Sequence, residues 1–247
     1  GAVRFRRLEN VLMKQSKQLL AIALPAFACC FFAANAPAQS INLGSGGGFV
    51  IDGSDPDNDG VGVFLSTFDV APGSPQDVVT ESQTVTLNDL NHTFLGDLQA
   101  FLVFDPLTPN DDTDDIFQSL FVSIAPGNEF AGDASDFGGT YTFDDDSTNS
   151  LWNAAAALDG NQVVPGGTYF PASRIEGDPN LEDPVSLDLA FGGRSTAGTW
   201  AIVMFDLLPP VDFGSLGGFT VDVTPVPESA SLGLLCIGAG LLKRRRG

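Results

Sequence analysis

The acidic residues whose spacing most suggests chemistry are Asp55, Asp57 and Asp59, which alternate along a loop that ends at Gly60. Three side chains at this spacing can converge on a hard cation such as calcium, and the glycine allows a sharp bend. Ser66 stands where a twelve-residue calcium loop usually has its bidentate glutamate. The segment is therefore either a calcium site or a solvated turn of Asp and Gly.

A run of three carboxylates at 144–146 is the second candidate calcium position. Neighbouring negative charges repel one another, and a bound cation would offset that repulsion. We expect Asp144 and Asp145 to be ligands here, and Asp97 is the further carboxylate that the fold would have to bring near. Calcium is the one cofactor that the sequence suggests.

Aromatic side chains offer a different chemistry, because an exposed ring can take part in binding a carbohydrate. Trp152 and Tyr169 are the candidate ligand-binding residues, together with Phe170. The alternative for all three is packing in the core or beneath a loop, which is the more usual place for large aromatic side chains.

The residue types that catalysis needs are scarce in this chain. His92 is the single histidine, so any Ser-His-Asp arrangement would need it, and no G-x-S-x-G motif presents a nucleophile. A single histidine and no cysteine between residues 39 and 226 argue against zinc. Paired carboxylates are so abundant that no pair is singled out for glycoside hydrolysis. We therefore expect a protein that is not an enzyme.

The front of the chain predicts export. Residues 13–38 combine a basic start, a long uncharged apolar stretch and a small-residue end, which are the three parts of a secretory signal peptide. Cleavage after Ala38 fits these residues best. Residues 1–12 precede the initiator that we favour, Met13, and are interpreted as an over-extended start.

The last residues, 225–247, form a tail of three parts. The tail begins with Val226-Pro227-Glu228 and Ser229. Thirteen uncharged residues come next, and one lysine and three arginines follow them. Thirteen residues make a helix of about 20 Å, shorter than the ~30 Å core of a bilayer. We expect a short apolar helix that associates with a membrane transiently while the polar motif is processed. A plain C-terminal anchor is the alternative.

In the order of its parts, this tail resembles the PEP-CTERM signal of Gram-negative bacteria, with Ser229 in place of the usual second proline. Proteins of that class are exported, processed by an exosortase and often associated with exopolysaccharide or biofilm matrix. The resemblance implies a signal peptidase and an exosortase as partners, with processing at Val226, Pro227 and Glu228. It also implies a transient inner-membrane stage and a final location at the cell surface or in the matrix.

The segment between the two signals is strongly acidic. Residues 39–226 hold 29 acidic residues against Arg174 and Arg194, a net charge of −27. The negative electrostatic field of this segment repels nucleic acids and anionic membrane surfaces, which excludes them as general partners. All three cysteines lie outside the segment, so it has no disulfide of its own. Its 188 residues suffice for one domain with a full core.

We expect β-strands to build that core. Four apolar residues from Leu98 to Phe104 alternate onto one face, and helical periodicity is confined to Leu151–Leu158. Further short segments rich in β-branched or aromatic residues are 84–87, 139–143, 200–205 and 219–223. Many short strands between Gly and Pro turns predict an all-β antiparallel sandwich or barrel. Gly44–Gly48 is predicted to be a flexible lead-in, and 224–227 a stiff spacer.

A series of landmarks in this segment resembles the P domain, also called P/Homo B, that follows the catalytic domain of proprotein convertases and many bacterial subtilases. In chain order the landmarks are His92-Thr93-Phe94-Leu95-Gly96-Asp97-Leu98, Phe143-Asp144-Asp145, Tyr169-Phe170-Pro171, Phe191-Gly192-Gly193, Gly198-Thr199-Trp200 and Asp212-Phe213-Gly214-Ser215-Leu216. That family's fold is a jelly-roll β-sandwich, which the resemblance implies for residues 39–224. Trp200 and Phe219 would then fill the core, while Gly96 and Gly214 would sit in turns with positive φ.

Three functions follow from these observations. A lone P-type domain with a sorting tail favours a non-catalytic surface or matrix protein that acts through interaction or as a structural component. The jelly-roll architecture and the sorting class favour a carbohydrate-binding module for the exopolysaccharide. The P-domain resemblance implies, as a third function, an accessory domain for a separate subtilisin-like protease.

Overall fold

The computed structural model describes residues 39–51, 61–106, 113–126, 132–175, 178–208 and 211–226. Its strands are β1 (Ile41–Ile51), β2 (Gly62–Val70), β3 (Thr80–His92), β4 (Leu98–Asp105), β5 (Ile116–Val122), β6 (Phe137–Asp144), β7 (Gly167–Tyr169), β8 (Ala172–Ile175), β9 (Asp178–Pro184), β10 (Gly198–Asp206) and β11 (Gly214–Pro225). Its short helices are η1 (Leu95–Asp97), α2 (Leu151–Ala156) and α3 (Leu187–Phe191). The helix predicted at Leu151–Leu158 is therefore confirmed, two residues shorter.

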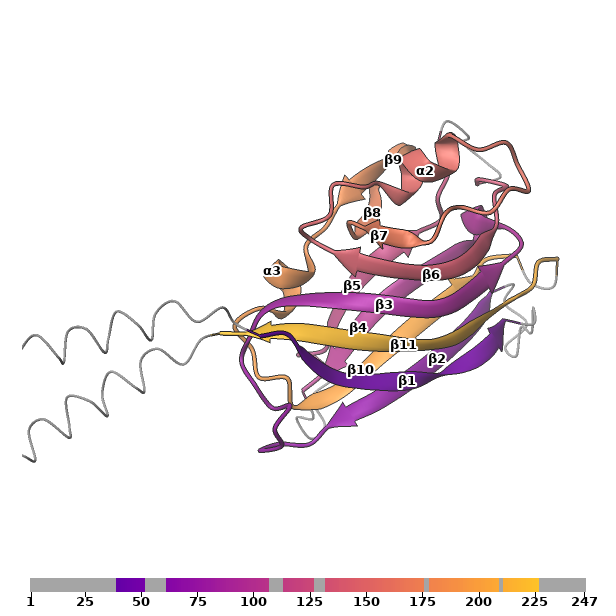
Figure 1. The fold of residues 1–247 in the computed structure, drawn as a ribbon. Helices are drawn as coiled ribbons and strands as arrows, with labels where there is room; N and C mark the ends of the chain where they lie inside the picture. Colours follow the sequence, from indigo (N-terminus) through magenta and orange to yellow (C-terminus); the bar gives the residue numbers. More distant parts are fainter. Residues whose placement is uncertain are drawn as a thin grey trace, which may run out of the picture. The chain divides into compact units, whose positions relative to one another are not determined.

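Nine of the strands form two facing sheets with the nested pairing of a jelly roll, while β8 and β9 pair with each other in a separate two-stranded sheet. One sheet has the order β1-β11-β3-β6-β7 and the other β2-β10-β4-β5 (Figure 1). The first strand pairs with the last, β2 with β10, β3 with β6 and β4 with β5, and each of these pairs is antiparallel. A folded ribbon of eight strands wrapped into two sheets gives this order. The predicted all-β jelly-roll sandwich is thus confirmed.

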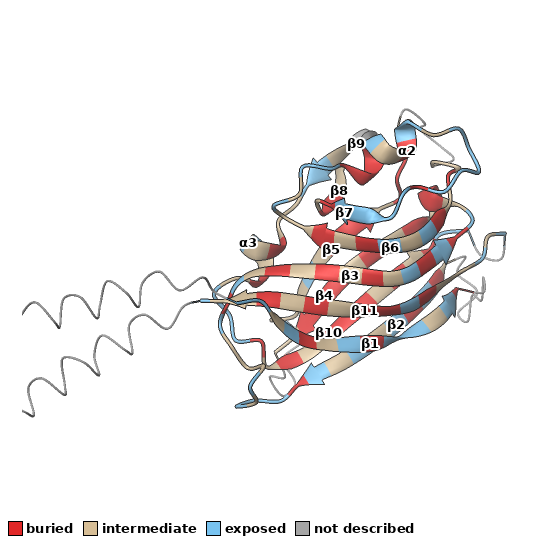
Figure 2. Ribbon diagram, in the orientation of Figure 1, coloured by how far each residue is buried: buried red, intermediate tan, exposed pale blue. Residues whose placement is uncertain are grey.

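The core lies between the two sheets and is rich in aromatic rings. In β4 the side chains of Leu98, Ala100, Leu102 and Phe104 are buried in turn, as their alternation predicts (Figure 2). The Trp200 ring of β10 packs at a tilt against the rings of Phe104 and Phe191, with ring centroids 4.5 Å and 5.4 Å away. Trp200 and Phe219 are both fully buried, which confirms the core positions predicted for them.

The glycine-rich segment Gly44–Gly48 is a strand rather than a flexible lead-in. It belongs to β1, whose partner along this stretch is β11. A Cβ atom on Gly46 would lie 2.0 Å from the Phe219 ring, and one on Gly44 would lie 2.6 Å from the Phe68 ring. The glycines therefore make room for core aromatic rings, and the flexibility inferred from composition is wrong.

Gly96 and Gly214 also have a role other than the predicted one, because neither has a positive φ. A Cβ atom on Gly96 would lie 2.4 Å from the Cα atom of Gly132, and one on Gly214 would lie 2.1 Å from the carbonyl oxygen of Asn91. Both positions need glycine for close backbone approach.

The predicted sorting signals lie mostly outside the described residues, as do Ala38, Pro227 and Glu228. At the boundary, the Val226 N–H donates to the Val79 carbonyl, and Pro225 ends β11, so the predicted spacer begins as part of a strand. Within the described ranges no helix is long and apolar enough to cross a membrane.

Candidate functional site

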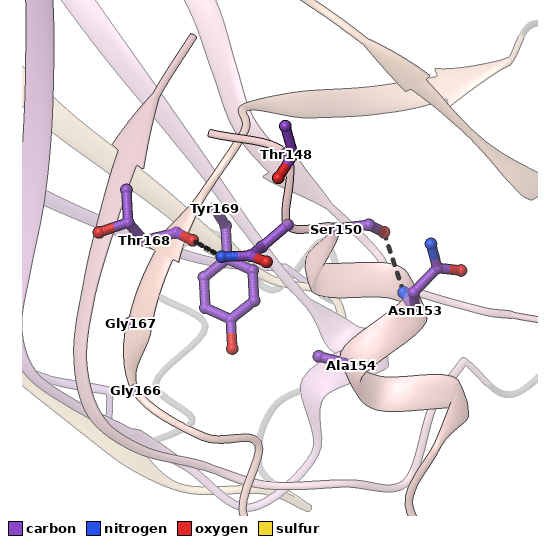
Figure 3. A pocket seen from close by; sticks show the side chains of 9 residues that line it. Thr148, Ser150, Asn153, Ala154, Gly166, Gly167, Thr168 and Tyr169 are labelled. Atoms are coloured by element: carbon purple, nitrogen blue, oxygen red, sulfur yellow. Dashed lines mark hydrogen bonds between the residues drawn. The ribbon is translucent and has the colours of Figure 1, made fainter. Parts of the chain in front are cut away.

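A polar pocket of about 530 Å³ lies between helix α2 and strand β7, at the edge of the five-stranded sheet (Figure 3). Its lining residues are Thr148, Asn149, Ser150, Asn153, Ala154, Gly166, Gly167, Thr168 and Tyr169. The Asn149 side-chain amide donates to the Thr168 carbonyl at 3.0 Å and joins the two walls. The Asn153 N–H donates to the Ser150 hydroxyl at 2.9 Å, which caps the start of α2.

The chemistry of this pocket is neutral and hydrogen-bonding. Its lining has no ionisable carboxylate or amine, although the whole segment is crowded with acidic residues. The exposed side chain of Asn153 can both donate and accept, and the Tyr169 ring borders the cavity. The volume falls within the range of small-molecule sites. A ligand with many hydroxyl groups and no charge matches such a lining.

Of the two predicted ligand-binding aromatics, Tyr169 lines the pocket and Trp152 does not. Tyr169 lines the pocket but is only 6% exposed, and its hydroxyl donates to the Pro165 carbonyl at 2.6 Å. Trp152 of α2 is 3% exposed and belongs to the core, so its ring is not the exposed platform that was considered. A ligand role for either residue stays a prediction.

The predicted calcium ligands at the end of β6 are engaged in local hydrogen bonds. Asp145 accepts hydrogen bonds from the Ser186 hydroxyl and from the N–H groups of Leu187 and Asp188, at 2.6 to 3.0 Å. It therefore ties β6 to the start of α3. Asp144 accepts from the Asp146 N–H at 2.9 Å, which closes a turn.

Asp97 does not join this group. In the pairing of β3 with β6, Asp144 lies opposite Thr84, whereas Phe137 lies opposite His92, so Asp97 follows the opposite end of β3. Among the described residues, no three His, Cys, Asp or Glu side chains are placed to hold a metal ion. The loop with Asp55, Asp57 and Asp59 lies outside the described residues, and calcium binding stays a prediction.

The histidine that a hydrolase would need is buried at the end of β3. His92 has no exposed surface, and its Nδ1 atom lies 2.8 Å from the Phe94 carbonyl oxygen. Its Nε2 atom faces the Oδ2 atom of Asp206, also fully buried, at 3.7 Å. Asp206 Oδ1 accepts from the Leu208 N–H, as expected for an Asp that ties a turn. These contacts hold three segments together.

Asp97 lies beside this pair in a crowded acidic environment. Burial raises its pKa to about 6, and the nearby carboxylates of Asp212 and Asp206 add to the shift. Burial raises the pKa of Asp136 as well, with a further contribution from Asp212.

The solvent side of the four-stranded sheet carries many apolar side chains, with Thr67 and Ser119 among them. Leu65, Val203 and Phe101 lie side by side across β2, β10 and β4. The Phe101 and Phe205 rings meet edge to face, with centroids 5.8 Å apart. We call the following eight side chains the outer apolar face: Val63, Leu65, Phe101, Val103, Phe117, Ala201, Val203 and Phe205.

Several members of the outer apolar face are open to solvent. Val63 is 51% exposed, Leu65 61% and Phe117 64%. Val103 and Ala201 are buried but lie outside the core cluster. The face ends in a polar row in which Asp69 and Asp105 flank Thr199.

The five-stranded sheet has the opposite character on its solvent side. On β3, β6 and β11 its outward positions include threonines and aspartates, namely Thr84, Thr86, Thr142, Asp144, Thr220 and Asp222, whereas Val50 of β1 is an exposed apolar residue. Thr86 and Thr142 hydrogen-bond across the strands at 3.0 Å. An antiparallel sheet with one wet face normally shows this pattern. The outer apolar face is therefore an exception within the same domain.

Sequence reasoning missed both the pocket and the outer apolar face. The signal for the face was present, because Val63-Phe64-Leu65, Phe101 to Phe104 and Ile202 to Phe205 are unbroken apolar runs. A strand with apolar residues at every position has two apolar faces. The pocket had no comparable signal, because residues 148–154 and 166–169 meet through the fold.

No protein-family model and no curated protein matches this chain. Among solved structures it is similar to the serine protease of Aeromonas sobria in complex with the chaperone ORF2. The TM-score is 0.35 and the identity 17%, over 78% of this chain and 28% of that one. For the serine protease of Aeromonas sobria in another structure, the values are 0.34 and 16%, over 78% and 29%. This chain thus spans less than a third of the protease's length, and likenesses this distant support no conclusion about family or activity.

Proposed function

We propose that this chain is an exported, non-catalytic domain that acts by binding, at the cell surface or in the exopolysaccharide matrix of a Gram-negative bacterium. The observation that carries the proposal is the outer apolar face. Soluble domains rarely leave a contiguous apolar patch uncovered unless it serves an interaction. The burial of His92, the single histidine, supports the absence of catalysis, because a general base must reach its substrate.

Export and sorting follow from the two ends of the sequence. In this proposal a signal peptidase cuts after Ala38, and an exosortase acts at Val226-Pro227-Glu228. Intact-mass measurement of the protein recovered from a host with an exosortase tests both steps. We expect a chain that begins at Gln39 and lacks the residues after Pro227 or Glu228. A mass that retains the arginine cluster would support a plain anchor instead.

Binding to the matrix is tested by co-sedimentation of residues 39–226 with purified exopolysaccharide or with intact biofilm matrix. We expect the protein to sediment with the matrix and to stay in solution without it. Casein and the exopolysaccharide should remain uncleaved in the same samples. Cleavage of either one, or no retention on any matrix fraction, would contradict the proposal.

Carbohydrate binding is the second candidate function, and the pocket between α2 and β7 favours it. We expect glycan-array binding of residues 39–226 to weaken about five- to thirtyfold in Asn153→Ala, because a lost hydrogen bond to a desolvated ligand group costs about 1–2 kcal/mol. Asn91→Ala, an exposed asparagine outside the pocket, is the matched control. Equal binding by both variants would remove the pocket as the site. A separate subtilisin-like protease is an alternative partner, which co-purification with the mature domain would reveal.

A further inference from the structure

We propose that Glu182 determines which sugars the pocket between α2 and β7 accepts, although this residue does not line the pocket itself. Its carboxylate holds the α2 wall in place and excludes anionic sugars such as uronates. The inference rests on the second candidate function, carbohydrate binding at this pocket, and adds the residue that sets the specificity. Glu182 is a positioning residue, because it acts through Ser150.

Glu182 of β9 is connected to the pocket through one buried side chain. The Ser150 hydroxyl lies 2.8 Å from one carboxylate oxygen of Glu182 and 2.7 Å from the other, so it donates to the carboxylate. The same hydroxyl accepts from the Asn153 N–H at 2.9 Å (Figure 3). Ser150 is 8% exposed and lines the pocket. The Glu182 carboxylate therefore lies directly behind the pocket wall.

These contacts hold the part of the wall that carries Asn153. Helix α2 has six residues, too few to be stable alone, and the Ser150 hydroxyl caps its first turn. Asn153 belongs to that turn, and its exposed side chain can donate to and accept from a ligand. Since the proton of the Ser150 hydroxyl is engaged by Glu182, this hydroxyl cannot donate to a sugar. Ser150 and Glu182 thus place the wall, and Asn153 makes the contact.

The negative charge of Glu182 acts on the ligand as well. The lining of the pocket has no cation, and residues 39–226 contain two arginines and no lysine. One of them, Arg174, lies directly opposite Glu182 in the pairing of β8 with β9, where the carboxylate offsets its positive charge. A uronate in the pocket would meet the negative charge behind Ser150, and salt screens partly buried charges only weakly. An uncharged sugar avoids this repulsion.

Glycan-binding measurements on residues 39–226 test the effect of the charge. This range forms one compact unit that contains every described strand and the whole core cluster. The probes are neutral hexose oligosaccharides and matched oligosaccharides in which uronates replace the hexoses. We expect the wild type to bind the uronate probes about tenfold or more weakly than the neutral ones.

Two matched variants separate the local charge from the field of the whole domain. Glu182→Gln keeps an oxygen that accepts from Ser150 but removes the charge, so the difference between the probes should shrink to about threefold or less while neutral binding is retained. Asp183→Asn removes an exposed carboxylate from the next position of β9 and should leave the difference unchanged.

A third variant tests the positioning. Glu182→Ala removes both the charge and the acceptor of the Ser150 hydroxyl, so we expect neutral probes to bind about fivefold or more weakly, whereas Glu182→Gln keeps neutral binding. Circular dichroism and thermal melting verify that the variants are folded. If Glu182→Ala does not fold, the comparison of Glu182→Gln with Asp183→Asn still decides the role of the charge.

The possible failures are distinguishable. Equal binding of neutral and uronate probes by the wild type would overturn the inference and leave carbohydrate binding intact. The same change of selectivity in Glu182→Gln and Asp183→Asn would also overturn it, because the general field of the domain would then be the cause. Absence of binding to every glycan would refute the inference together with the carbohydrate candidate, but not binding through the outer apolar face.

Discussion

At the scale of single residues, Trp152 illustrates how a predicted binding residue can be a core residue. Its ring is buried, and its indole N–H has no hydrogen-bond partner among the described residues. An unpaired buried donor costs free energy, whereas the ring itself contributes apolar burial. The side chain therefore stabilises the domain through its shape more than through its polarity.

Replacing Trp152 should separate these two contributions. We expect Trp152→Ala to lower the free energy of unfolding by about 3–5 kcal/mol, because it leaves a cavity. Trp152→Phe should change it by less than about 1.5 kcal/mol, because the smaller ring loses contacts but also removes the unpaired N–H. Urea unfolding of residues 39–226 measures both. A Trp152→Ala domain as stable as the wild type would contradict the core assignment.

Asp97 gives a prediction for the pH dependence of stability. Since its pKa is raised from 3.8 to about 6 in the folded state, the folded protein holds this proton more tightly than the unfolded chain does. The free energy of unfolding should therefore fall as the pH rises from about 4 through about 6. Burial and Asp212, the two leading causes, both act in this direction.

The variant Asp97→Asn cannot ionise, so its stability should fall less over this pH range and exceed that of the wild type above about pH 7. Thermal melting at a series of pH values measures the difference. Asp146→Asn, which removes an exposed carboxylate, serves as the control. The same slope in Asp97→Asn as in the wild type would refute the role of Asp97.

At the scale of elements, α3 depends on a carboxylate from a distant strand. Asp145 accepts three hydrogen bonds at the N-terminal end of this five-residue helix, which is too short to be stable alone. We expect Asp145→Ala to lower the free energy of unfolding by about 1–3 kcal/mol. Hydrogen exchange at Leu187–Phe191 should become faster as well.

Asp146→Ala is the neighbouring control, because the backbone N–H of Asp146 makes the turn contact and its side chain is exposed. We expect it to change stability by less than about 0.5 kcal/mol. If added calcium raises the free energy of unfolding of Asp145→Ala and of the wild type equally, Asp145 is not a calcium ligand.

Strands could be predicted from the sequence where polar and apolar residues alternate, as in Leu98 to Phe104. Prediction from the sequence failed where the role of a residue depends on contacts with distant parts of the chain. The glycines of β1 suggested flexibility, but they accommodate the rings of Phe68 and Phe219 from distant parts of the chain. The alternation in β4 predicts only its core side, because Phe101 and Val103 make the opposite side of the same strand apolar as well. The pocket could not be predicted from the sequence, because its two walls are brought together only by tertiary structure.

At the scale of the whole molecule, the crowded acidic residues repel one another, and bound calcium would reduce this repulsion. If a site exists, binding to the folded state raises stability by about 2.7 kcal/mol at a hundredfold excess over Kd. The melting temperature of residues 39–226 should then rise with calcium and drop with a chelator. Asp57→Asn should abolish the rise if the loop is the site, whereas Asp144→Asn should do so if the end of β6 is. If neither calcium nor chelator changes the melting temperature of the wild type, the domain does not bind calcium.

The place of β11 in the five-stranded sheet has a consequence for the order in which the strands can pair during synthesis. β11 lies between β1 and β3, so β1, the first strand made, has no partner in this sheet until the last strand arrives. Pairing over such a separation closes late and slowly. We therefore expect β1 to stay unpaired in this sheet until residues 214–225 have been made. The five-stranded sheet is then completed only by the last strand of the domain.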